Sequence, residues 1–401
     1  MKFMQSKKRN KKFKNNDLLI LVSVIIFMAC VSLLAGILPK NDKPKLIGFS
    51  FMENDKFGFM DKTGKIKIPA MYDERIYSFS EKLAAVSLNG KHGYIDKTGE
   101  QKIKMEFDSA RSFSEKFAVV SIDGNYGYIN ANGNFEIPAQ FEDARSFHDG
   151  LAAVKIGGVW GYIDKKGSIK INPQYSAAAN FSNGLAAVEK DGFWGIINKK
   201  GAIIAEIEYQ EISKSFADSL ILAKKGEYYG YIDKKGNLAI DFNYGDAAPF
   251  SENLAKTSQN GLYGYIDKKG NFAIYGAYSE CSDFSEGLAF AAASGTEGIP
   301  SYFVIDKKGS IIMSAQFTGY RNFKNGFAAV SIGDKWGIID KKGSYVVNPQ
   351  YYAISDFESG LAIVRLENKV GVIDKKGGIA IEIKYENNDS LNYYGLSMVM
   401  E

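Results

Sequence analysis

The 401-residue sequence has little of what disulfide-stabilised or metal-dependent proteins use, because it contains only two cysteines and two histidines. Cys30 lies in a long apolar segment far from Cys281, so no disulfide within the chain is expected. His92 and His148 stand in no metal-ligand spacing, and the sequence has neither a calcium-binding loop nor a glycine-rich phosphate loop before a helix. We therefore expect no cofactor and no metal.

Net charge is also small, and it is unevenly distributed. The chain carries +4, of which residues 1–17 contribute +6, so the remainder is near neutral at −2. A near-neutral remainder excludes nucleic acid as a bulk electrostatic partner.

The amino-terminal segment differs from everything after it. Residues 1–17 hold seven basic residues and one acidic residue, and residues 18–38 then run for 21 residues without a charge. As a helix that run spans about 31 Å, enough to cross a bilayer. We predict a basic cytoplasmic tail (1–17), a transmembrane signal anchor (18–38), a linker (39–45) and an extracytoplasmic domain (46–401). The alternatives are a cleaved signal peptide, which would release a secreted protein, and a lipoprotein modified at Cys30.

Between residues 57 and 385 a sequence motif of about 34 residues is repeated ten times, and it is clearest as WGYIDKKGSIKINPQY from Trp160. The step is 34 or 35 residues except between Gly264 and Phe303, where it is 39. Fixed-period repetition predicts a tandem array in which each unit packs on its neighbours. The longer step inserts about five residues into the A-to-B hairpin of the eighth unit, which gives the loop 293–301. Such a loop is either a binding contact or the result of sequence drift at a tolerant position.

Alternating apolar residues predict three antiparallel strands per unit, which we call A, B and C. In the fourth unit these are residues 151–156, 160–163 and 168–172. Asn-Gly, Asp-Gly or Gly-Gly pairs, such as Asn89-Gly90, predict type I′ turns between A and B. Between B and C most units read Asp-Lys-Lys-Gly, a four-residue turn in which the Asp carboxylate accepts a backbone N–H and the Gly adopts a left-handed conformation.

A phenylalanine recurs between strand C and the next strand A, Phe181 and Phe357 being examples. Its regularity predicts a socket at the boundary between neighbouring units. The full set comprises Phe79, Phe113, Phe147, Phe181, Phe216, Phe250, Phe284, Phe323 and Phe357.

Three units begin strand B with Trp-Gly, and on these pairs the array resembles the bacterial WG repeat, also called the KWG repeat. The pairs are Trp160-Gly161, Trp194-Gly195 and Trp336-Gly337. Other units hold Phe or Tyr before the Gly, while His92, Val370 and Tyr302-Phe303 depart from the pattern. The resemblance implies a β-rich interaction module without established catalytic residues.

The strand pattern leaves closure of the array open. Strand A occurs eleven times, from residues 46–52 to residues 396–399, against ten copies of B and C. An open array needs an extra piece to cover its last face, and three-stranded units of 34 residues are short for propeller blades. An open β-solenoid or superhelix is therefore favoured over a β-propeller.

Paired lysines occupy the same B-to-C turn in seven units. If the units stack regularly, these turns align into a basic rim that would contact an anionic ligand, although solvated turns also favour lysine. The fold and the rim together predict a non-enzymatic binding or scaffold module for a protein or an anionic envelope glycan; the alternatives are a carbohydrate-active enzyme of the cell envelope and a structural spacer. The rim consists of Lys165, Lys166, Lys199, Lys200, Lys234, Lys235, Lys268, Lys269, Lys307, Lys308, Lys341, Lys342, Lys375 and Lys376.

Overall fold

The computed structural model describes residues 44–214, 219–293, 301–386 and 396–401, without the side chains of residues 315 and 316. The repeat array forms one compact unit, Lys45–Glu401. No helix in the described part of the chain is long and apolar enough to cross a membrane. The predicted anchor at 18–38 lies outside these residues, as does most of the insertion at 293–301.

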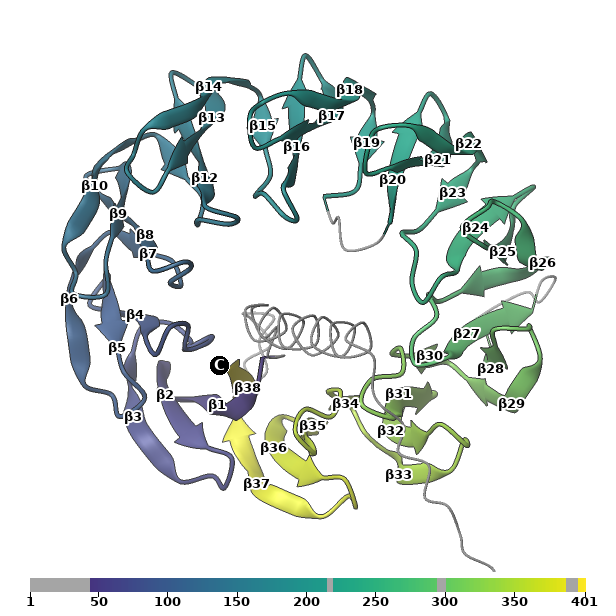
Figure 1. Ribbon diagram of the computed structural model, residues 1–401. Coiled ribbons are helices and arrows are strands. Elements are labelled where there is room, and N and C mark those ends of the chain that lie inside the picture. The colour runs from purple at the N-terminus through teal and green to yellow at the C-terminus, as the bar shows by residue number, and fades with distance from the viewer. Residues whose placement is uncertain (1–43, 215–218, 294–300, 387–395) are drawn as a thin grey trace, which may run out of the picture. The chain divides into compact units, whose positions relative to one another are not determined.

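The array is built entirely from β-strands that recur in a fixed order (Figure 1). The A strands are β1 (Leu46–Glu53), β4 (Ala84–Leu88), β8 (Ala118–Ile122), β12 (Leu151–Ile156), β16 (Leu185–Lys190), β20 (Leu220–Lys225), β24 (Ala255–Gln259), β27 (Leu288–Ala293), β31 (Phe327–Ile332), β35 (Leu361–Leu366) and β38 (Leu396–Met400). The B strands are β2 (Lys56–Asp61), β5 (Lys91–Ile95), β9 (Asn125–Ile129), β13 (Val159–Asp164), β17 (Phe193–Asn198), β21 (Tyr228–Asp233), β25 (Leu262–Ile266), β28 (Tyr302–Asp306), β32 (Lys335–Asp340) and β36 (Lys369–Asp374). The C strands are β3 (Ile66–Tyr72), β6 (Gln101–Phe107), β10 (Phe135–Phe141), β14 (Ile169–Tyr175), β18 (Ile203–Tyr209), β22 (Leu238–Tyr244), β26 (Phe272–Cys281), β29 (Ile311–Phe317), β33 (Tyr345–Tyr351) and β37 (Ile379–Glu386).

Most units contain a fourth strand that the sequence analysis missed. It is only two residues long and pairs with the edge of strand A, as β11 does with β12. Two residues are too few to show the alternation by which strands are found in a sequence. The short strands are β7 (Ser109–Ala110), β11 (Asp143–Ala144), β15 (Ala177–Ala178), β19 (Glu211–Ile212), β23 (Asp246–Ala247), β30 (Gly319–Tyr320) and β34 (Ala353–Ile354). In the eighth unit the end of β26 takes this place and joins two units into one seven-stranded sheet.

The Trp-Gly pair is explained by a bulge in strand C. Trp160 lies opposite Tyr175, whereas Tyr162 lies opposite Ile171, so strand C carries extra residues at this point and its backbone comes close to strand B. A Cβ added to Gly161 would lie 2.6 Å from the Ile171 carbonyl oxygen. Only glycine fits here, while the aromatic residue before it packs across the two strands. Trp160 is buried, and Trp194 and Trp336 are half-buried.

The recurring phenylalanines that the structure describes fill sockets between neighbouring units, as predicted, while Phe216 lies outside the described residues. Phe181 is 2% exposed and its ring lies 4.8 Å from that of Tyr162, in strand B of the preceding unit. The Tyr162 hydroxyl donates a hydrogen bond of 2.7 Å to the Ala179 carbonyl, so the same tyrosine links the two units through both its ring and its oxygen. The arrangement repeats for Tyr94 with Phe113, Tyr128 with Phe147, Tyr231 with Phe250 and Tyr265 with Phe284.

The two ends of the array pair with each other. The surplus A strand, β38, runs antiparallel to β1, and no individual sheet closes on itself. Phe51 of the first unit and Val370 of the last share one hydrophobic cluster, and a Cβ added to Gly64 would lie 3.4 Å from Ile381, so the last unit contacts the first. The reason given for an open array is corrected on this point, because the extra strand does not cover a free last face but pairs with the first strand.

Candidate functional site

The lysine turns owe their shape to the residues on either side of the lysines. In the fourth unit Asp164 Oδ1 accepts hydrogen bonds from the backbone N–H groups of Lys166 (2.9 Å) and Ser168 (3.0 Å). Gly167 closes the turn with φ +78° and donates to the Asp164 carbonyl at 2.9 Å. This confirms the predicted turn. Because the carboxylate is occupied with the backbone, the Lys165 and Lys166 side chains have no part in shaping the turn.

Successive lysine turns have equivalent positions along the array. The turn glycine of each unit lies against strand C of the unit before it: a Cβ on Gly167 would lie 3.3 Å from Ile137, and one on Gly201 would lie 3.4 Å from Ile171. The equivalent contact occurs in the last unit, where Gly377 lies against Val347. Of the fourteen predicted rim lysines, thirteen are exposed and Lys268 is half-buried.

A second row of turns lies just before eight of the described A strands, and the sequence analysis missed it. We call these the pre-A turns. Both central residues have positive φ, for example Glu115 (+54°) with Lys116 (+76°) and Asp149 (+52°) with Gly150 (+82°). Glutamate and lysine are unusual in this conformation, which is why the turn is not evident from the sequence. The first central residues are Glu81, Glu115, Asp149, Asn183, Glu252, Glu286, Asn325 and Ser359.

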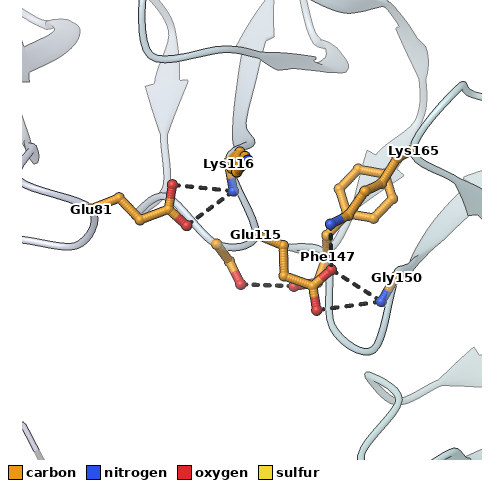
Figure 2. Close-up of polar contacts among 7 residues, drawn as sticks. Glu81, Glu115, Lys116, Phe147, Gly150 and Lys165 are labelled. Atoms are coloured by element: carbon orange, nitrogen blue, oxygen red, sulfur yellow. Dashed lines mark hydrogen bonds and ion pairs between the residues drawn. The ribbon is translucent and has the colours of Figure 1, made fainter. Parts of the chain in front are cut away.

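Hydrogen bonds connect neighbouring pre-A turns in most of the described units (Figure 2). The Glu81 carboxylate accepts the Lys116 N–H at 3.0 Å, and the Glu115 carboxylate accepts the Gly150 N–H at 3.0 Å. The Ser114 hydroxyl donates to the carbonyl of Phe147, the socket phenylalanine of the next unit, at 2.7 Å. Equivalent bonds join Asp149 to Gly184, Glu252 to Gly287 and Glu286 to Gly326. The acidic residues of this row therefore have a structural role between units.

The two rows of turns meet at the same end of each sheet, because the first residue of strand A pairs with the last residue of strand B. Lys165 Nζ lies 3.0 Å from Glu115 Oε2 of the preceding unit, as Figure 2 shows. Lys307 Nζ lies 2.9 Å from Glu252 Oε2 in the same way. Burial of Glu252 acts to raise its pKa, but hydrogen bonds from Lys307 and from backbone N–H groups outweigh it, so the pKa is lowered. The rim is thus a surface of mixed charge in which some lysines already have a carboxylate partner.

The other titratable residues that the sequence singled out take ordinary places in the repeat. His92 occupies the aromatic position of strand B opposite Phe107, and His148 occupies the first position of a pre-A turn, bridged to Leu151. Cys281 is a buried thiol whose pKa is raised by burial to about 11. Within the described residues no three His, Cys, Asp or Glu side chains gather as metal ligands would.

Comparison with known proteins gives one specific match. The family model described as "WG containing repeat" matches residues 57–91, 93–126, 126–160, 160–192, 194–229, 229–263, 263–292, 302–336, 336–369 and 371–401. A comparison with curated proteins found no match.

Two solved structures that resemble the chain do so at low identity. A eukaryotic initiation factor is 12% identical with a TM-score of 0.46, covering 84% of this chain and 95% of its own. Kluyveromyces lactis Hsv2p is 9% identical with a TM-score of 0.34, covering 65% of this chain and 96% of its own. The ten matched segments span almost the whole array, each running from strand B of one unit through strand A of the next, and the chain belongs to the WG containing repeat family.

Proposed function

We propose that this protein is a non-enzymatic binding or scaffold module, and that its lysine turns contact an anionic envelope polymer or an acidic protein surface. The observation that carries the proposal is the repetition of an exposed lysine pair in turns whose shape does not depend on it. Asn130-Ala131-Asn132-Gly133 forms the same turn without lysine, with Asn130 Oδ1 accepting the Asn132 and Asn134 N–H groups at 2.9 and 3.1 Å. The lysines therefore contribute charge, at equivalent positions in seven units.

The full-length protein in detergent, applied to isolated anionic envelope polymer over a series of salt concentrations, tests this proposal. Retention should fall steeply as salt rises, because each lysine that neutralises an anion releases a counterion. A variant with the rim lysines changed to Gln should lose this salt-sensitive retention, and a matched variant with the same lysines changed to Arg should keep it. If the Gln variant is retained as well as the parent, the rim lysines do not bind the polymer and are only solvated surface residues.

We further propose that residues 18–38 anchor the protein in the membrane with its amino terminus in the cytoplasm and its array outside, on the charge asymmetry of the flanking segments. Lys341→Cys places a thiol in an exposed turn, and Lys8→Cys places one in the basic tail. An impermeant thiol reagent applied to intact cells should label the first variant and not the second, with the parent chain as background. Labelling of Lys8→Cys alone would reverse the topology.

A further inference from the structure

Two neighbouring lysine turns, in the fifth and sixth units, have fewer carboxylates around them than their counterparts. In the fifth unit Asn198 replaces the Asp that opens the other Lys-Lys turns, and it accepts the same backbone hydrogen bonds, from Lys200 at 2.9 Å and Ala202 at 3.1 Å. In the pre-A turn of that unit Asn183 stands where Glu115 and Glu252 stand in theirs. Lys234 of the sixth unit has the same position relative to Asn183 that Lys165 of the fourth unit has relative to Glu115.

These two turns are adjacent through strand β18. A Cβ added to Gly236, at the end of the second turn, would lie 1.8 Å from the Ile204 carbonyl oxygen of β18, which begins just after the first turn. Lys199, Lys200, Lys234 and Lys235 are all exposed, and none of the four forms an ion pair within the described part of the chain. Within the two turns themselves, Asp233 is the one carboxylate set against four ammonium groups.

The fourth and eighth units provide the contrast. There the first lysine of the turn is already neutralised, Lys165 by Glu115 and Lys307 by Glu252. An anionic ligand that binds at those turns must compete with a carboxylate which itself holds backbone N–H groups of the next unit. At the turn of unit five the equivalent carboxylate is Asp149, which accepts the Gly184 N–H and forms no ion pair with Lys199 among the described residues, and at unit six its place is taken by Asn183. A ligand at these two turns therefore meets four ammonium groups that have no ion-pair partner, and it relieves the repulsion among them.

We infer that the turns at 198–201 and 233–236 are the main contact site for a linear phosphate-bearing polymer. The inference rests on the proposed function and names where on the rim, and with what chemistry, the ligand binds. Lysine binds phosphate as a point charge and needs no fixed geometry. A linear polymer can occupy both turns at once and release several counterions.

Binding of long-chain inorganic polyphosphate to the full-length protein, measured over a salt series, tests this with two matched variants. One changes Lys199, Lys200, Lys234 and Lys235 to Gln, and the other changes Lys165, Lys166, Lys307 and Lys308 to Gln, so each removes four charges. The first should lower affinity by about 10-fold or more at low salt and flatten the salt slope by about 3, and the second should lower affinity several-fold less. Thermal unfolding of both variants serves as a folding control.

A single substitution tests the role of the missing carboxylate. Asn183→Asp introduces at Lys234 the partner that Glu115 provides for Lys165, and should weaken polyphosphate binding severalfold, whereas Asn183→Ser, which copies Ser359, should not. If the parent shows no salt-sensitive binding, the proposed function fails and the inference with it. If the parent binds but the two four-lysine variants lose affinity equally, or Asn183→Asp binds like the parent, the inference alone is overturned.

Discussion

Two features repeat with similar regularity in the sequence, namely the aromatic residues at the boundary between units and the lysine turns. The reasons for their repetition differ. At the boundary Phe181 and Tyr162 are almost completely buried and touch each other, so packing accounts for their recurrence. In the turns the lysine side chains are exposed, and Asp164 and Gly167 account for the local shape. The comparison teaches that stability explains the repeated aromatic residues and leaves the repeated lysines to be explained by charge.

The largest expected effect is at the boundary. Phe181→Ala removes a buried ring from between two units and should lower the free energy of unfolding by about 3–5 kcal/mol, because the lost contacts leave a cavity. Chemical denaturation followed by circular dichroism measures this. Phe193→Ala is the control, since that ring is 41% exposed, and should cost far less. Similar losses from both would mean that the socket is not what holds adjacent units together.

Gly343→Val tests the backbone conformation of a lysine turn rather than its charge. Gly343 has φ +85°, and a Cβ there would lie 2.8 Å from the flexible Met313 side chain of the preceding unit. A β-branched residue in this conformation is strained by about 1–3 kcal/mol, so the melting temperature should fall measurably. Gly90→Val has a similar φ of +72° and nothing within 4 Å, and it separates backbone strain from contact with the neighbouring unit.

Tyr162→Phe retains the ring at the boundary and removes only its hydrogen bond to the Ala179 carbonyl. The loss should be about 1–2 kcal/mol, because a buried acceptor is left without its donor. Ile196 occupies the same position in the next unit and has no hydroxyl, so the array tolerates its absence elsewhere. Equilibrium unfolding of Tyr162→Phe and Phe181→Ala, measured side by side, separates the contribution of this hydrogen bond from that of packing. If Tyr162→Phe lowered the free energy of unfolding as much as Phe181→Ala does, packing would not be the larger contribution.

Much of this arrangement could be predicted from one sequence, since ten copies serve as their own comparison. The turn glycines, the A-to-B hairpins and the socket phenylalanines all follow from local rules: positive φ favours Gly, and a recurring buried ring needs a partner. Gly167 and Phe181 lie where those rules place them.

What could not be predicted depends on contacts between distant residues or on unusual backbone. The pairing of β1 with β38 joins residues some 350 positions apart, and no local pattern states which edge a surplus strand will cover. The pre-A turns put Glu115 and Lys116 at positive φ, against their preference, because the Glu115 carboxylate bonds to the next turn. Carboxylates of these turns also pair with some rim lysines, such as Lys165 and Lys307, so the charge of the candidate site was evident from the sequence and its distribution was not.

A smaller effect concerns the aspartates that open the turns. Hydrogen bonds from the Thr63 and Thr98 side chains lower the pKa of Asp61 and Asp96 from 3.8 to about 2. A lowered folded-state pKa stabilises the array above about pH 4, and this contribution is lost as the pH falls toward 2. Replacing both residues with Asn, which forms the same turn at Asn130, should reduce the drop in melting temperature between pH 4 and pH 2. An unchanged drop would assign the acid sensitivity to other carboxylates.

The smallest expected effect is the loss of a rim lysine itself. Lys341 is exposed at the centre of its turn and forms no ion pair among the described residues, so Lys341→Ser should change the free energy of unfolding by less than about 0.5 kcal/mol. Lys165→Ser is the matched case in which an ion pair with Glu115 is lost, and that pair is itself exposed enough to contribute little. Both variants should unfold at nearly the parent's denaturant concentration. A loss of 2 kcal/mol or more at Lys341 would give the lysines a role in stability, and their repetition would then need no ligand to explain it.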